Sequence, residues 1–115
     1  MDYKELIVWN KSMELVELVY KLTKTFPKDE YFGLRSQIRR SALSIPSNIA
    51  EGNCRRTKGE YIQFLSIANG SKGELETQVI LAHRLGFINS NNFKLLINQI
   101  IEISKMLYAL MKSLR

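Results

Sequence analysis

The sequence predicts an all-α fold, an antiparallel up-down-up-down four-helix bundle that forms one domain over residues 1–115. Three observations predict this fold. Apolar residues recur at the helical spacings of three and four in four successive segments. The connections between these segments are short and polar, as expected between antiparallel helices. A chain of 115 residues that is 45% hydrophobic and 24% charged also has the size and composition of one globular domain.

The first helix is expected over residues 4–25. Its apolar stripe consists of Trp9, Met13, Val16 and Tyr20, widened by Val8, Leu15, Val19 and Leu22. The pair Phe26-Pro27 ends the helix, because the residue before a proline is disfavoured in helical geometry.

The second helix is expected over residues 28–52. Asp29 and Glu30 in its first turn interact favourably with the positive end of the helix dipole, and Gly52 is a suitable residue for its C-terminal cap. The apolar stripe consists of Tyr31, Leu34, Ile38, Ala42, Ile45 and Ile49. Because this stripe continues through Pro46, we predict one helix that is kinked at Pro46 rather than two helices. A second stripe of mostly small residues lies opposite, formed by Ser36, Leu43, Ser47, Ala50 and Cys54.

The third helix is expected over residues 58–85. A capping box from Thr57 to Glu60 begins it, and Gly86 ends it. Its apolar face consists of Tyr61, Phe64, Leu65, Ala68, Leu75, Val79 and Ala82. Gly70 and Gly73 interrupt this face, and each costs about 1 kcal/mol relative to Ala inside a helix. We predict a continuous helix, with a neighbouring helix packed closely over the two glycines.

The fourth helix is expected over residues 91–114, after a polar loop. Between Phe93 and Leu114, 14 of 22 residues are hydrophobic, so the helix is apolar around most of its circumference. Such a helix is buried on more than one side. We therefore expect its surplus apolar residues, among them Ile101, Tyr108 and Met111, to contact another subunit in a homo-oligomer. The alternative is that they are isolated apolar residues on the surface, which are common.

Several classes of chemistry are excluded by missing residues. The only histidine, His83, lacks the Glu-x-x-His or His-Glu-x-x-His spacing of helical metal sites, and the single Cys54 excludes an internal disulfide. No glycine-rich phosphate loop is present. We therefore expect no enzymatic activity, no metal and no cofactor. No apolar run has the length of a membrane span, and the N-terminus does not resemble a signal peptide, so a cytoplasmic protein is expected.

The positive charge is concentrated in one part of the chain. The protein has a net charge of +6, and residues 28–58 contribute +4 from seven basic and three acidic residues. The candidate nucleic-acid-binding residues are Arg35, Arg39, Arg40, Arg55, Arg56 and Lys58. Clustered arginines suit phosphate oxygens, so we predict a non-enzymatic protein that binds RNA or DNA. Alternatively, these residues form a solvated basic surface, or they pair with Glu51 and Glu60 or with carboxylates of a neighbouring subunit. The alternative function is an oligomeric adaptor whose basic surface binds an unknown protein partner.

Several motifs together suggest a family. The most specific is the stretch Ser44-Ile-Pro-Ser-Asn-Ile-Ala-Glu-Gly52, and others lie at residues 33–42, 60–68 and 70–78. The chain closely resembles the bacterial four-helix bundle proteins encoded in intervening sequences of 23S ribosomal RNA genes. This resemblance implies a ring-like homopentamer without established enzymatic activity. It also implies kinship with the accessory variability protein of diversity-generating retroelements. Arg39, Arg40, Arg55 and Arg56 match positions where the family is commonly basic.

The signature stretch is interpreted as architectural. Its candidate residues are Ser44, Pro46, Ser47, Asn48, Glu51 and Gly52. We expect the two serines to bond to nearby carbonyls, and Asn48 to satisfy groups that the proline kink leaves free. The stretch would then set the helix geometry that the subunit contact needs. The alternative is that Asn48 and Glu51 form a ligand site.

Overall fold

The structure, a computed structural model, describes all residues from 1 to 115 and is entirely helical. Four long helices form a compact bundle, as predicted: α1 (Ile7–Leu22), α2 (Leu34–Asn53), α3 (Lys58–Arg84) and α4 (Ser90–Ser113). Short 3₁₀ turns lie at Tyr3–Glu5, Thr23–Thr25 and Lys28–Glu30. None of the helices combines the length and the apolar content that crossing a membrane requires.

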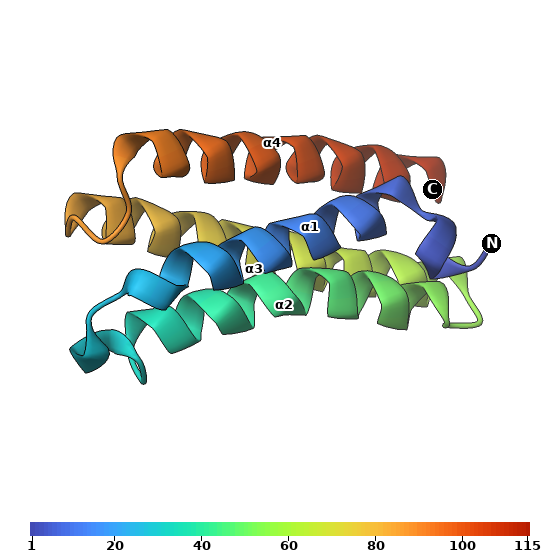
Figure 1. The fold of residues 1–115 in the computed structure, drawn as a ribbon. Helices are drawn as coiled ribbons and strands as arrows, with labels where there is room; N and C mark the ends of the chain where they lie inside the picture. The colour runs from blue at the N-terminus through green and yellow to red at the C-terminus, as the bar shows by residue number, and fades with distance from the viewer.

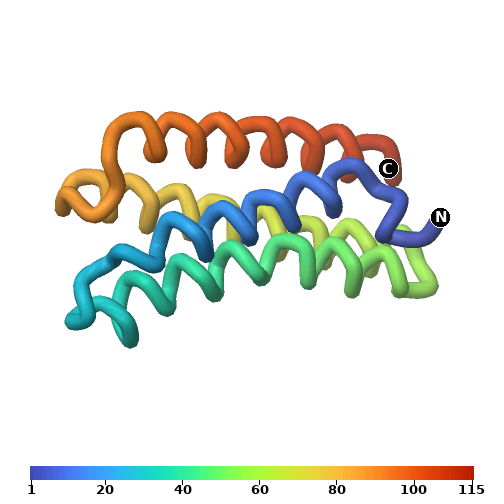
Figure 2. The backbone as a smooth tube through the Cα atoms, viewed as in Figure 1, coloured from blue at the N-terminus to red at the C-terminus, as the bar shows by residue number.

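Consecutive helices run in opposite directions, and both ends of the chain lie at the same end of the bundle (Figure 1). The molecule measures 43 × 24 × 20 Å. Each helix packs against two others, α2 against α1 and α3, and α4 against α1 and α3. The backbone trace shows the four helices lying lengthwise along the long axis of the molecule (Figure 2).

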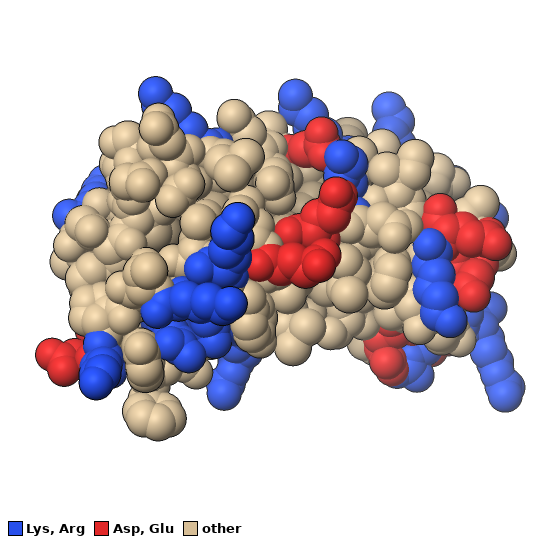
Figure 3. Space-filling view, viewed as in Figure 1, with Lys and Arg blue, Asp and Glu red and all other residues tan.

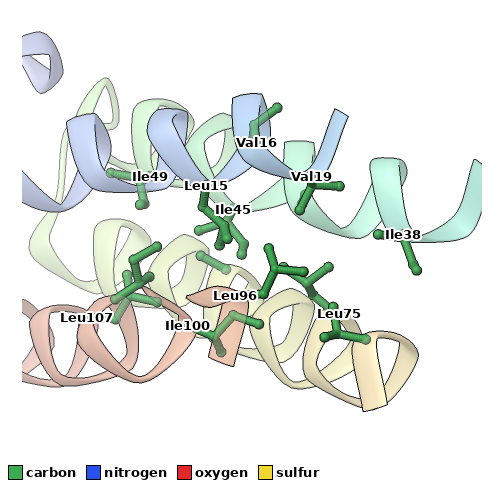
Figure 4. Packing of buried hydrophobic residues seen from close by; sticks show 14 of the residues in the cluster. Leu15, Val16, Val19, Ile38, Ile45, Ile49, Leu75, Leu96, Ile100 and Leu107 are labelled. Atoms are coloured by element: carbon green, nitrogen blue, oxygen red, sulfur yellow. The ribbon is translucent and has the colours of Figure 1, made fainter. Parts of the chain in front are cut away.

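The core lies along the bundle axis and receives residues from all four helices (Figure 4). Nineteen buried hydrophobic residues form it. On α2 four stripe residues are buried as predicted: Ile38, Ala42, Ile45 and Ile49. Ser41, Pro46 and Gly52 are also buried, whereas the stripe residue Leu34 is only partly buried. On α1 the buried line is shifted relative to the predicted stripe. Val8, Leu15 and Val19 are buried, whereas Trp9 is only partly buried and Tyr20 is 39% exposed.

The predicted start of α2 is wrong by several residues. Lys28–Glu30 forms a separate 3₁₀ turn, and α2 begins only at Leu34. Gly33 lies between them with φ −107° and ψ −115°, outside helical geometry. The Glu30 carboxylate then accepts a hydrogen bond from the Leu34 amide at 3.0 Å, so it caps α2 from outside rather than lying in its first turn. Similarly, the extended Leu6 separates the turn at Tyr3–Glu5 from α1.

Helix α2 passes through Pro46 without a break. This proline is buried, and it has no N–H to offer the Ala42 carbonyl. As predicted, Ser47 donates to a nearby carbonyl, that of Leu43, at 2.8 Å. The prediction for Ser44 is wrong, because its hydroxyl pairs with the Ser71 hydroxyl rather than with a carbonyl. Asn48 donates to the Ser44 carbonyl at 2.8 Å. The Asn48 side-chain amide therefore does not donate to the Ala42 carbonyl, which the proline leaves without a backbone partner. The bend angle at Pro46 stays a prediction.

Helix α3 is continuous through both internal glycines, which confirms that prediction, but the expected reason is wrong. A Cβ atom added at Gly70 or Gly73 would meet nothing within 4 Å, so no helix packs over them. The close approach is instead at Gly52. A Cβ atom there would lie 2.8 Å from Cβ of Phe64 and 3.0 Å from Cδ1 of Tyr61.

Gly52 therefore has a packing role and not the predicted capping role. It lies inside α2, which ends at Asn53 with Cys54 in right-handed helical geometry. The only residue with positive φ is Gly86, at 81°, after the end of α3. The missing side chain of Gly52 lets α2 and α3 meet near the turn that joins them.

Candidate nucleic-acid interface

The six predicted basic residues do not form one cluster. Arg35, Arg39 and Arg40 lie in the first half of α2, whereas Arg55, Arg56 and Lys58 lie around the turn that joins α2 to α3. At about 1.5 Å of rise per residue, Arg39 and Arg55 are separated by about 24 Å along the helix direction. The structure therefore divides the predicted site into two groups near opposite ends of the bundle.

Arg39 joins α2 to the end of α1. Its Nε donates to Oγ1 of Thr23 at 2.9 Å, and its Nη2 donates to the carbonyl oxygen of Tyr20 at 3.1 Å. The guanidinium also lies 4.4 Å from the centre of the Tyr20 ring. A cation that binds the last carbonyls of a helix also interacts favourably with the negative end of the helix dipole. Arg39 thus holds α1 and α2 together, a structural role that the sequence did not indicate.

A groove opens beside Arg39. The Arg35 guanidinium lies 3.9 Å from the centre of the Tyr31 ring, Arg40 is exposed, and Phe32 is 98% exposed. The groove has a volume of 390 Å³ and is lined by Tyr20, Tyr31, Phe32, Arg35, Ser36, Arg39, Arg40 and Leu43. It therefore combines aromatic rings with three arginines.

A second groove, of 410 Å³, lies next to the first and shares Tyr20 and Leu43 with it. It adds two cations, Lys21 and Lys24, and one carboxylate, Glu17. We call the two grooves together the α1–α2 basic surface. Its cationic residues are Lys21, Lys24, Arg35, Arg39 and Arg40. Figure 3 shows Lys and Arg side chains gathered over the end of α1 and the start of α2.

The cations of the α1–α2 basic surface have no carboxylate partners. The molecule contains two ion pairs, Lys11 with Glu102 and Arg55 with Glu51, and both lie elsewhere. The charge distribution along the sequence did not indicate Lys21 and Lys24, because residues 1–27 carry equal numbers of acidic and basic residues. Only the packing of α1 against α2 brings these lysines to the arginines.

The second group, at the turn between α2 and α3, is partly neutralised. Arg55 forms its ion pair with Glu51, and its guanidinium lies 4.7 Å from the centre of the Phe64 ring. Arg56 and Lys58 are exposed and have no carboxylate partner. The Thr57 hydroxyl accepts a hydrogen bond from the Glu60 amide at 3.1 Å, which confirms the N-terminal cap that the capping box predicted. The Glu60 carboxylate accepts from the Thr57 hydroxyl at 3.0 Å and not from the backbone N–H that a full capping box would use.

The signature residues make contacts within the chain. The Ser44 hydroxyl lies 2.7 Å from that of Ser71 and so links α2 to α3, while Asn48 also donates to Oγ of Ser44 at 2.9 Å. Glu51 binds Arg55. The Asn48 amide and the Glu51 carboxylate are thus each engaged by a residue of α2 or of its C-terminal turn. These contacts favour the architectural interpretation over a ligand site.

His83 lies in the last turn of α3, which ends at the same end of the bundle as α1 (Figure 1). Its ring stacks on Phe93 of α4 with 4.2 Å between ring centres and 13° between planes. Its Nε2 lies 3.4 Å from Oγ of Ser90. His83 therefore packs the end of α3 against the start of α4, and no three His, Cys, Asp or Glu side chains gather closely enough to hold a metal ion.

Comparison with known proteins places the chain in a family. Residues 4–109 match the family of the 23S rRNA-intervening sequence protein. No curated protein matches the sequence. The fold is similar to the 1.70 Å crystal structure of a protein of unknown function from the S23 ribosomal protein family of Bacteroides thetaiotaomicron. The TM-score is 0.86 at 29% sequence identity, over 92% of this chain and 99% of that chain. The chain therefore belongs to the 23S rRNA-intervening sequence protein family.

Proposed function

We propose that this protein is not an enzyme and that it binds nucleic acid, RNA or DNA, through the α1–α2 basic surface. One observation carries the proposal: five cations lie on adjoining grooves without a carboxylate partner. Phosphates would neutralise these charges and release bound counterions, which makes binding strong at low salt and independent of sequence. Arg56 and Lys58 would add a second contact to phosphate near the other end of the bundle.

We further propose that the protein works as a homo-oligomer, a ring-like pentamer. Exposed apolar side chains on α4 support this proposal. Ile101 and Tyr108 on this helix are 42% and 66% exposed. A contact between subunits would remove these residues from water. An oligomer would also repeat the α1–α2 basic surface, so that modest contacts with one nucleic acid strengthen one another.

The test is a binding titration of a labelled oligonucleotide at several salt concentrations. The decisive variant is Arg40→Gln, because Arg40 is exposed and makes no hydrogen bond or ion pair within the chain. We expect it to weaken binding and to reduce the salt slope by about 0.7–0.9 for one lost phosphate contact. The control is Lys112→Gln, which removes the same charge near the opposite end of the bundle. Equal effects of both variants would contradict the proposed surface.

A second candidate function is an oligomeric adaptor that binds another protein. An apolar groove of 360 Å³ between the N-terminal segment and the end of α4 favours it. The groove is lined by Met1, Glu5, Leu6, Ile7, Val8, Met106, Ala109 and Leu110. Ile7 within it is 67% exposed. The adaptor alternative predicts that the oligonucleotide binds no more tightly than to an unrelated protein of equal charge.

A further inference from the structure

Phe32 is the most exposed large hydrophobic residue of the chain, at 98%. It lies in the connection between the turn at Lys28–Glu30 and the start of α2. A single exposed apolar residue is common in proteins and needs no explanation. Phe32, however, lines the groove that also holds Tyr20, Tyr31 and three arginines. Phe32 therefore places an exposed aromatic ring at the edge of a cationic groove.

Two of the arginines in this groove already lie over aromatic rings. The Arg35 guanidinium is 3.9 Å from the centre of the Tyr31 ring, and the Arg39 guanidinium is 4.4 Å from that of Tyr20. These contacts, together with the hydrogen bonds of Arg39, restrict the guanidinium planes before any ligand arrives. Aromatic rings and arginine planes are the surfaces on which unpaired nucleobases stack.

We infer that the groove binds an unpaired segment of nucleic acid, with one base stacked on Phe32 and the flanking phosphates held by Arg35, Arg39 and Arg40. This inference rests on the proposed function and names its substrate class. A duplex cannot use the groove in this way, because the faces of its bases are covered by neighbouring base pairs. The volume of 390 Å³ lies within the range of about 300–1,000 Å³ that is typical of small-molecule sites.

The charge around Phe32 favours this occupant over a second copy of the chain. A second copy carries a net charge of +6 and would have to place an acidic face against Arg35, Arg39 and Arg40. An unpaired nucleic acid supplies a flat base and a phosphate on each side of it. It therefore complements both the ring and the cations of the groove.

The experiment measures fluorescence anisotropy with four labelled probes: single-stranded RNA, single-stranded DNA of the same sequence, its duplex, and a single-stranded DNA with abasic sites. Both base-containing single strands should bind more tightly than the duplex and the abasic strand. Phe32→Ala should weaken binding of the single strands by about fivefold or more, the low end of the cost of removing one base–aromatic stack. Binding of the duplex should not change.

Two further variants serve as controls. Leu81→Ala removes another exposed apolar side chain, on α3 and outside the proposed subunit contact, and should leave binding of single strands unchanged. Phe32→Trp should retain the binding of single strands. The fluorescence that the new tryptophan adds to that of the native Trp9 should be quenched when a single strand binds. Because Phe32 is almost fully exposed, both substitutions at this position should leave the fold intact, which circular dichroism checks.

The results separate this inference from the proposed function. The inference would be overturned if the protein bound single strands and duplex with equal affinity, or if Phe32→Ala bound single strands as tightly as the wild type. The proposed function would still stand in either case if Arg40→Gln weakened binding. If Arg40→Gln bound the oligonucleotide as tightly as the wild type, the proposed function itself would be overturned. A change in the native mass of Phe32→Ala at wild-type affinity would show that a second copy covers Phe32, and would overturn the inference.

Discussion

Two substitutions of glycine by alanine should have opposite effects on stability, although both glycines lie inside helices. At Gly52, the added Cβ would lie 2.8 Å from Cβ of Phe64 and 3.2 Å from the carbonyl oxygen of Tyr61. Neither atom is at the end of a flexible side chain, so α2 and α3 must move apart. Overpacking costs about 1–3 kcal/mol, and we expect the upper part of this range. Subtracting a gain in helix propensity of about 1 kcal/mol leaves a net destabilisation of about 1–2 kcal/mol.

Gly73→Ala is the matched control. An added Cβ at Gly73 meets nothing within 4 Å, so only the gain in helix propensity remains. We expect a stabilisation of about 0.5–1 kcal/mol. For a chain of 115 residues, the unfolding entropy of about 2.1 cal/mol/K per residue makes 1 kcal/mol equivalent to about 4 °C in Tm. Gly52→Ala should therefore lower Tm by about 4–8 °C, and Gly73→Ala should raise it by about 2–4 °C.

The assay is thermal and urea unfolding followed by far-ultraviolet circular dichroism, repeated at several protein concentrations because an oligomer gains stability with concentration. A Gly52→Ala protein as stable as the wild type would refute the close contact between α2 and α3. A destabilised Gly73→Ala protein would refute the open surface over α3 and would indicate that a second copy covers this position.

Three further predictions concern the helix ends and the proline. Arg39→Ala should lower the free energy of unfolding by about 1–2 kcal/mol, because the carbonyl of Tyr20 and the hydroxyl of Thr23 lose their donor; urea unfolding measures this loss. Thr57→Ala should cost about 1 kcal/mol by removing the N-terminal cap of α3, measured in the same way. Pro46→Ala should keep the helix content and change the assembly, and sedimentation that showed an unchanged oligomer would contradict the architectural role of the signature stretch.

Local patterns in the sequence were sufficient for much of the fold. The helical spacing of apolar residues from Ile38 to Ile49 predicted the buried face of α2 and its continuity through Pro46. The capping box at Thr57 predicted the start of α3. These features depend on residues within one or two helical turns of each other, so a linear reading contains all the information that they need.

The start of α2 was predicted incorrectly because two local signals competed. Acidic residues after a proline are typical of a first helical turn, and Asp29 and Glu30 follow Pro27. The chain instead breaks at Gly33, and Glu30 caps the helix from outside. The roles of the helical glycines also depended on packing. Sequence alone could not reveal that Gly52, and not Gly70 or Gly73, faces a neighbouring helix.

The candidate site depended most on the arrangement of the helices in space. The arginines of residues 35–56 look like one cluster along the chain, but a helix of 20 residues extends over about 30 Å and carries them to opposite ends. The residues that share a surface with Arg35, Arg39 and Arg40 are instead Tyr20 and Lys21 of α1 and Lys24 of the 3₁₀ turn that follows it. Helix formation follows from neighbours along the chain. Which charges share a surface follows from contacts between distant segments, and these form only when the apolar faces pack together.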